Sequence, residues 1–218
     1  MVGTLTSDEA WRYYERFAVK QDRQGWYEDA ALDWLVEHGN FEQANSVLEV
    51  GCGTGRFAAR LIDGHLPGHA LYLGLDISTR MLAIACEKLA GSGARLLQCD
   101  VTMALPVRDA SADRLIVAYV LDLLSEAEAR ALVGEASRVL VPGGLLCLAS
   151  LARSPSGGLA WVSSWLWTMA QRLAPLRVGG CRPIDLAGML EANVWHIEER
   201  TTVRPWSVAS DALVARRL

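Results

Sequence analysis

The chain has 218 residues, of which 51% are hydrophobic and 21% are charged, and its formal net charge at pH 7 is -4. This length suits one α/β domain with a substantial core. The acidic balance argues against a protein that binds nucleic acid through bulk electrostatics, so we expect no nucleic-acid partner. The five cysteines include no CxxC pair, which predicts neither a disulfide framework nor a metal site.

The compartment is expected to be the cytoplasm, because the cysteine pattern suits a reducing environment. The N-terminus soon turns charged and no apolar run reaches about 18 residues, so we expect neither a signal peptide nor a transmembrane helix. Peripheral contact with a membrane and the oligomeric state both remain open.

The first 40 residues predict a helical cap with helices over 8–18 and 27–38. Strands and helices then alternate, which predicts a parallel sheet with right-handed crossovers. The expected elements in chain order are a strand Ser46–Val50, a helix Arg56–Ile62, a strand Leu71–Leu75, a helix from Ser78 to Leu89, a strand Arg95–Gln98, a strand Asp113–Tyr119, a helix Ser125–Leu140 stopped by Pro142-Gly143-Gly144, and a strand Leu145–Leu151.

The C-terminal region departs from this alternation. After an expected helix from Asp185, the segments Trp195–Val203 and Ser207–Arg216 predict two strands joined by only three residues. So short a link permits an antiparallel hairpin but no parallel crossover. We therefore expect one α/β domain over 1–218: a Rossmann-like, doubly wound, mostly parallel seven-stranded sheet with a C-terminal antiparallel hairpin. Its parts are the cap (1–40), a cofactor-binding core (41–152), an insertion (153–185) and the C-terminal helix and hairpin (186–218).

A glycine turn follows the first strand and carries the most specific local signal: Gly51-Cys52-Gly53-Thr54-Gly55. Glycines let the backbone turn sharply and approach a ligand, and the N–H groups of the next helix can receive a polar group. A dinucleotide site would place its third glycine at position 56, which is Arg56. The early glycine, together with Glu49 at the strand end, resembles the methyltransferase version of this turn, which holds the methionine part of S-adenosylmethionine.

Carboxylates end the next two strands. Asp76 can accept hydrogen bonds from both hydroxyls of a ribose, a feature that NAD shares with S-adenosylmethionine. Asp100 can accept from an adenine amino group, with the N–H of Val101 beside it. Ligands bind outside the carboxyl ends of an open parallel sheet, so the turn and both carboxylates are predicted to share one site.

Four segments together resemble class I S-adenosylmethionine-dependent methyltransferases, in the group that includes ubiquinone/menaquinone C-methyltransferases and bacterial phospholipid N-methyltransferases. They are Val47–Phe57, Leu73–Ser78, Leu97–Asp100 and Glu135–Gly144, and the resemblance covers roughly residues 40–152.

The resemblance implies S-adenosylmethionine as the cofactor and S-adenosylhomocysteine as the product. It places Ile77 against adenine, Tyr119 near the sulfonium and Tyr14 on a covering helix, where simple helix packing is an equal alternative. The full set of expected cofactor residues is Tyr14, Glu49, Gly51, Cys52, Gly53, Thr54, Gly55, Asp76, Ile77, Met81, Asp100, Val101 and Tyr119.

The acceptor is expected to be a small, lipophilic molecule bound near the insertion. Residues 157–176 carry an apolar stripe at helical spacing with Trp165 and Met169, and Trp167 lies close by. A helix packed on the core, a hydrophobic lid over the acceptor and a membrane-interface helix all remain open. Arg182 could contact an anionic acceptor or serve in a surface salt bridge.

The chemistry expected is an in-line displacement at the sulfonium methyl, for which the protein aligns the acceptor and excludes water. Asp22, Asp122 and His196 are conceivable bases, but no motif selects among them, so the catalytic residue is unknown. An NAD(P) oxidoreductase and a non-catalytic cofactor-binding module are the alternatives. An arsenite methyltransferase is disfavoured, because Cys52, Cys99 and Cys147 do not form a thiolate set near the sulfonium.

Overall fold

The computed structural model describes residues 25–152, 182–205 and 208–218. Within this part, the helices are α2 (Gly25–His38), α3 (Arg56–Gly64), α4 (Thr79–Lys88) and α5 (Glu126–Val139), with short 3-10 helices at Phe41–Gln43 and Ala187–Met189. The expected helix over 8–18 and the insertion helix over 157–176 lie outside the described residues.

The described strands form one sheet in the order β3-β2-β1-β4-β5-β7-β6. Their bounds are β1 Ser46–Val50, β2 Leu71–Asp76, β3 Arg95–Gln98, β4 Ala112–Ala118, β5 Leu140–Leu151, β6 Trp195–Val203 and β7 Ser210–Arg217. The first five strands pair in parallel, whereas β7 runs antiparallel to both β5 and β6. This confirms the mostly parallel, Rossmann-like sheet with its antiparallel C-terminal strands.

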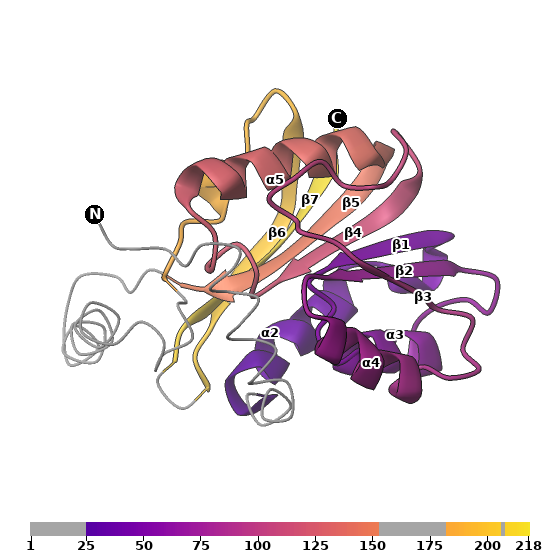
Figure 1. Cartoon of the computed structure of the whole chain (residues 1–218). Coiled ribbons are helices and arrows are strands. Elements are labelled where there is room, and N and C mark those ends of the chain that lie inside the picture. Colours follow the sequence, from indigo (N-terminus) through magenta and orange to yellow (C-terminus); the bar gives the residue numbers. More distant parts are fainter. Residues whose placement is uncertain (1–24, 153–181, 206–207) are drawn as a thin grey trace.

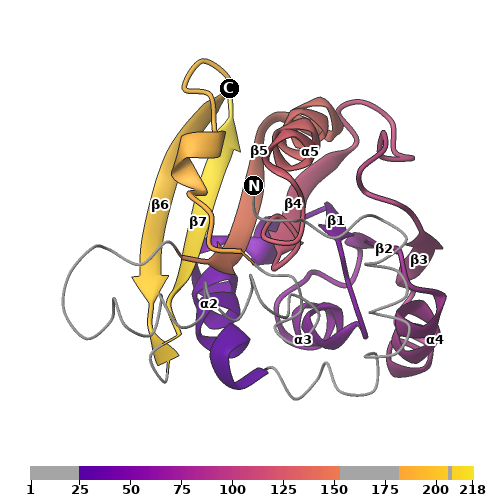
Figure 2. The same ribbon diagram turned by 60° about the vertical axis from the view of Figure 1, so that its left-hand side comes forward.

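The helices make the molecule three-layered. Figures 1 and 2 show α5 on one face of the sheet and α2, α3 and α4 on the other. Alternate residues of β4 serve the two layers: Leu115 packs in the core beneath α5, and Ile116 packs in the core beneath α2 and α3. This strand is therefore apolar on both faces, as a parallel strand covered on both sides requires.

Side chains fix the ends of the helices that border the site. Ser78 caps α4 by accepting a hydrogen bond from the N–H of Met81 at 3.2 Å. Ser125 and Glu128 form the predicted capping box at the start of α5. The buried Arg114 on β4 donates to the carbonyls of Gly39 (2.8 Å) and Asn40 (2.7 Å), which anchors the chain just after α2.

Three expectations about element bounds were wrong. Pro142-Gly143-Gly144 does not separate α5 from the next strand, because β5 already begins at Leu140 and absorbs these residues at a register shift opposite Ala112–Arg114. Only Ala187–Met189 is helical after Asp185. The last strand begins at Ser210 rather than Ser207, so the link from Val203 is longer than expected. No helix in the described ranges is long and apolar enough to cross a membrane.

Candidate active site

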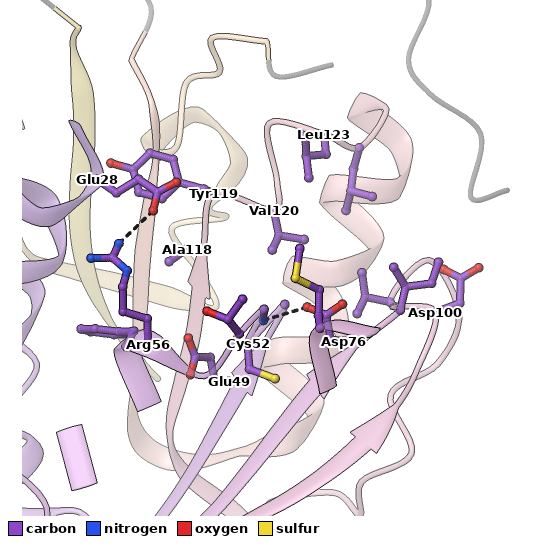
Figure 3. A pocket seen from close by; sticks show the side chains of 18 of the residues that line it. Glu28, Glu49, Cys52, Arg56, Asp76, Asp100, Ala118, Tyr119, Val120 and Leu123 are labelled. Carbon is purple, nitrogen blue, oxygen red and sulfur yellow. Dashed lines mark hydrogen bonds and ion pairs between the residues drawn. The ribbon is translucent and has the colours of Figure 1, made fainter. Parts of the chain in front are cut away.

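A cavity lies at the carboxyl ends of β1, β2 and β4, where the strand order reverses between β1 and β4. Open α/β sheets bind their ligands at such a switch point. Figure 3 shows Asp100 at one end of the cavity, Glu28 and Arg56 at the other, and Asp76 between them. The described lining consists of Glu28, Leu32, Glu49, Gly51, Cys52, Gly53, Thr54, Arg56, Phe57, Asp76, Ile77, Met81, Asp100, Val101, Thr102, Ala118, Tyr119, Val120, Leu123, Leu124 and Glu128.

The glycine turn requires glycine for two separate reasons. Gly51, Gly53 and Gly55 all adopt positive φ angles (77°, 54° and 72°), and a residue with a Cβ adopts such angles only at a cost in free energy. A Cβ on Gly51 would also lie 2.2 Å from Cγ2 of Val120. The turn therefore brings bare backbone to the cavity, where its atoms can approach a ligand closely.

Asp76 connects the turn to the second strand. Its carboxylate accepts hydrogen bonds from the N–H of Gly53 at 2.8 Å and from the N–H of Ser78 at 2.9 Å. These contacts fix the carboxylate at the cavity wall, and the residue is only 8% exposed. A carboxylate can accept several hydrogen bonds, which suits contact with two neighbouring hydroxyls.

Asp100 holds the loop after β3 in a similar manner. One carboxylate oxygen accepts from the N–H (3.0 Å) and the hydroxyl (2.7 Å) of Thr102. This local turn presents both Asp100 and Val101 to the cavity. A carboxylate and a neighbouring backbone N–H suit the amino group and ring nitrogen of adenine.

Glu49 is a buried acid at the base of the cavity. The Tyr72 hydroxyl donates to its carboxylate. Burial and, to a lesser degree, the negative charge of Asp76 raise the pKa of Glu49 to about 8. A cation bound beside such a carboxyl group favours its ionised form. Glu49 therefore suits an ammonium group.

The far end of the cavity is formed by an ion pair between two helices. Arg56, the first residue of α3, contacts Glu28 of α2 at 3.0 Å and also pairs with Asp29. Burial raises the pKa of Glu28, against the opposing effect of Arg56. Glu28 and Arg56 both line the cavity (Figure 3), so α2 and α3 together close this end of it through these side chains.

Tyr119 stands at the end of β4 in a strained conformation. Its φ of 56° is rare for a bulky residue, and such strain persists only where surrounding contacts enforce it. Its hydroxyl contacts Ser210 Oγ at 2.9 Å, and its ring packs edge to face on Tyr27 with centroids 5.8 Å apart. These contacts fix the ring at the cavity wall. Burial raises the pKa of Tyr119, so the phenol is a poor base.

Most of the cofactor residues expected from the sequence meet in this cavity. Gly55 does not line it and instead precedes α3, where a Cβ would lie 3.0 Å from that of Ala85. Tyr14, Trp165, Trp167 and Met169 lie outside the described residues. Arg182 is described but is absent from the lining, and its Nε donates to the carbonyl of Leu124 at 2.7 Å. The residues brought together as expected are Glu49, Gly51, Cys52, Gly53, Thr54, Asp76, Ile77, Met81, Asp100, Val101 and Tyr119.

The conceivable bases do not reach the cavity from the described part of the chain. Asp122 is fully buried outside the lining, and neither carboxylate oxygen makes a hydrogen bond of ordinary geometry. His196 is exposed on β6, and Asp22 lies outside the described residues. We therefore assign no catalytic base.

Cysteine chemistry also finds no support in the described part of the chain. Burial raises the pKa of Cys52 far above its ordinary value, that of Cys147 to about 12 and that of Cys99 less strongly. Raised thiol pKa values oppose the thiolates that metalloid chemistry needs. No group of three or more His, Cys, Asp or Glu residues in the described ranges could hold a metal ion.

Sequence reasoning missed the residues that complete the cavity from α2. Glu28 precedes the glycine turn by more than 20 residues and reaches the cavity only because α2 packs across β5 and β7. A signal was present, however: Asp29 and Asp33 on α2 repeat at the same spacing as Arg56 and Arg60 on α3, and each acid pairs with one arginine. Apolar lining from Leu32, Phe57, Ala118, Val120, Leu123 and Leu124 was also not foreseen.

The fold is an open α/β domain, and the cavity at the switch point of its sheet is lined by groups that suit a nucleoside-type ligand. Comparison with known proteins gives the class. Residues 47–144 match the family model described as "Methyltransferase domain". These residues therefore form a methyltransferase domain, which supports the class I S-adenosylmethionine-dependent methyltransferase that the sequence motifs predicted.

Relatives with assigned names carry different activities. The chain is 35% identical over 150 residues to malonyl-[acyl-carrier protein] O-methyltransferase of Erwinia pyrifoliae (69% of this chain, 52% of the relative). It is 34% identical over 118 residues to demethylmenaquinone methyltransferase of Thermus thermophilus (53% of this chain, 51% of the relative). The chain spans about half the length of these relatives.

Solved structures share the fold at low sequence identity. The N-methyltransferase NodS from Bradyrhizobium japonicum, in complex with S-adenosyl-L-homocysteine, superimposes with a TM-score of 0.68 at 18% identity, covering 95% of this chain and 98% of that one. A putative methyltransferase from Haloferax volcanii, in complex with the Trm112 methyltransferase activator, has a TM-score of 0.73 at 16% identity, covering 94% of this chain and 97% of that one.

Proposed function

We propose that this protein transfers a methyl group from S-adenosylmethionine to a small, lipophilic acceptor. The observation that carries the proposal is the convergence of Asp76, Asp100 and the bare backbone of the glycine turn on one cavity. A cofactor made of adenine, ribose and an amino acid matches these groups in the order in which they lie along the cavity (Figure 3).

The residues present fit this cofactor. Asp100 and Val101 would hold adenine, with Ile77 and Met81 along the ring. Asp76 would accept from the ribose hydroxyls, and the glycine turn, whose bare backbone lines the cavity, would pass beside the methionine part. S-adenosylmethionine supplies a methyl group already activated on a sulfonium, so no residue has to activate the donor.

The work left to the protein is alignment and exclusion of water. Tyr119 is locked at the end of β4 by Ser210 and Tyr27, which makes it a rigid wall beside the reacting centre. The apolar side chains of Val120, Leu123 and Leu124 follow it along the cavity. A dry, fixed wall favours in-line approach of an acceptor to within about 3–3.5 Å of the methyl carbon.

A lipophilic acceptor is supported by this apolar lining and by the relative named for demethylmenaquinone. The alternative of an NAD(P) oxidoreductase is disfavoured by Arg56. It occupies the position of the third dinucleotide glycine, and its side chain is held in ion pairs at one end of the cavity.

The proposal is tested by incubating the full chain with methyl-labelled S-adenosylmethionine and a panel of acceptors: a demethylmenaquinol, a malonyl thioester, a long-chain amine and a phenol. We expect label in at least one product, with loss of the label when S-adenosylhomocysteine is added in excess. Binding of S-adenosylhomocysteine without transfer to any acceptor would support the non-catalytic module instead.

A further inference from the structure

The charges that line the cavity are strongly unbalanced. Among the described lining residues, five side chains are acidic and one is basic. A cofactor whose amino-acid end carries a carboxylate must place that group somewhere in this acidic cavity, and an uncompensated pair of buried carboxylates is costly. Arg56 is the single cationic side chain that the described lining offers; the acidic members are Glu28, Glu49, Asp76, Asp100 and Glu128.

The position of Arg56 matches this requirement. Asp100 and Asp76 occupy the adenosine end of the cavity, and Arg56 lies at the opposite end beyond the glycine turn (Figure 3). Its side chain is about one-third exposed, so the guanidinium is partly desolvated and still reachable. A guanidinium binds carboxylates through paired N–H groups, which gives both strength and geometry.

Arg56 already has carboxylate partners. Glu28 approaches it at 3.0 Å, and Asp29 binds its other terminal nitrogen. Asp29 is half exposed, whereas Glu28 is buried in the cavity wall. A third carboxylate that arrives from the cavity side would therefore meet Glu28 first and compete with it for the same guanidinium.

We propose that Arg56 is the receptor for the methionine carboxylate of the cofactor, and that Glu28 competes with this carboxylate for Arg56. The inference rests on the proposed function, since it presupposes that the cavity takes S-adenosylmethionine. It assigns to Arg56 a role in choosing cofactors that carry an amino-acid end, beyond its contact between α2 and α3.

The chain contains a matched control for this role. Arg60 lies one turn further along α3 and pairs with Asp33 of α2, so it links the same two helices. Arg60 is absent from the cavity lining. If Arg56 served only to join the helices, replacement of either arginine would have the same effect on ligand binding.

Two probes separate the amino-acid end from the rest of the cofactor. S-adenosylhomocysteine carries the complete amino-acid end, and 5'-methylthioadenosine lacks it. Both are titrated calorimetrically into the wild-type chain and into Arg56→Met, Arg56→Lys, Arg60→Met and Glu28→Gln. Thermal unfolding of each variant provides the check on folding.

Arg56→Met is expected to weaken S-adenosylhomocysteine about ten- to a hundredfold and to leave 5'-methylthioadenosine within about twofold. Arg56→Lys retains the charge and should retain part of the preference even if Arg56→Met folds poorly. Arg60→Met should change neither affinity. Glu28→Gln removes the competing charge and should strengthen S-adenosylhomocysteine about two- to tenfold, again without effect on 5'-methylthioadenosine.

Equal loss of both ligands in Arg56→Met, or unchanged affinity for both, would overturn the assignment of the carboxylate receptor. Weaker S-adenosylhomocysteine binding in Glu28→Gln would overturn the competition and indicate that Glu28 holds the ammonium group. Failure of the wild-type chain to bind either probe would count against the proposed function itself, which keeps the two failures distinct.

Discussion

Gly51 offers the sharpest test of the glycine turn, because its replacement by alanine has two separable costs. The φ of 77° is left-handed, which costs an L-residue about 1–2 kcal/mol. The new Cβ would lie 2.2 Å from Cγ2 of Val120, and overpacking of this kind costs about 1–3 kcal/mol. We therefore expect Gly51→Ala to lower the free energy of unfolding by about 2–5 kcal/mol.

A double-mutant cycle separates the two costs. Val120→Ala removes the clashing methyl group but not the backbone strain, so Gly51→Ala/Val120→Ala should be less destabilised than the sum of the single variants by about 1–3 kcal/mol. The assay is denaturant unfolding followed by circular dichroism. Gly134→Ala is the control: it lies in α5 with no atom within 4 Å of its Cβ and should gain about 0.5–1 kcal/mol. Additive single effects, or a Gly51→Ala variant as stable as wild type, would refute the reasoning.

Three further predictions follow from the buried polar groups. Burial raises the pKa of Asp122 to about 7, so the folded protein keeps a proton that the unfolded chain releases near pH 4, and stability falls as pH rises between these values. Asp122→Asn should flatten this part of the pH–stability profile and raise the free energy of unfolding at pH 8 by roughly a few kcal/mol. The free energy of unfolding is measured by urea titration at several pH values, and an unchanged dependence on pH in Asp122→Asn would contradict the burial argument. Tyr119→Phe should lose about 1 kcal/mol through its contact with Ser210, and a cycle with Ser210→Ala should show coupling; additivity would deny that the contact matters. Asp76→Asn should weaken the binding of S-adenosylhomocysteine, measured by calorimetry, about ten- to a hundredfold. Asp113→Asn is the control and should not weaken it, because this carboxylate also accepts backbone N–H bonds but lies at the opposite edge of the sheet. Equal effects of the two substitutions would argue against a ribose contact.

The end of the cavity at Asp76 and Asp100 could be predicted from the sequence because its determinants are local. The glycines, Asp76 and Asp100 each follow a short apolar strand, and parallel strands bring their carboxyl ends to one edge. Ser78 and Ser125 precede helices and cap them as their sequence context indicates. In each case, residues within a few positions determine the structure.

The end of the cavity at Glu28 and Arg56 could not be predicted in the same way. Glu28 reaches Arg56 only through the packing of α2 on β5 and β7, which joins residues almost 30 positions apart. The extent of β5 was missed because proline and two glycines normally end regular structure, while here a register shift against β4 accommodates them. Long-range packing therefore decided what local signals left open.

We propose that the cavity is shaped for an adenosyl amino acid and not for a dinucleotide. The most direct measurement is a pair of calorimetric titrations of the full chain, one with S-adenosylhomocysteine and one with NADH. We expect saturable one-to-one binding of S-adenosylhomocysteine and no binding of NADH at the same concentration. Binding of NADH without binding of S-adenosylhomocysteine would contradict it.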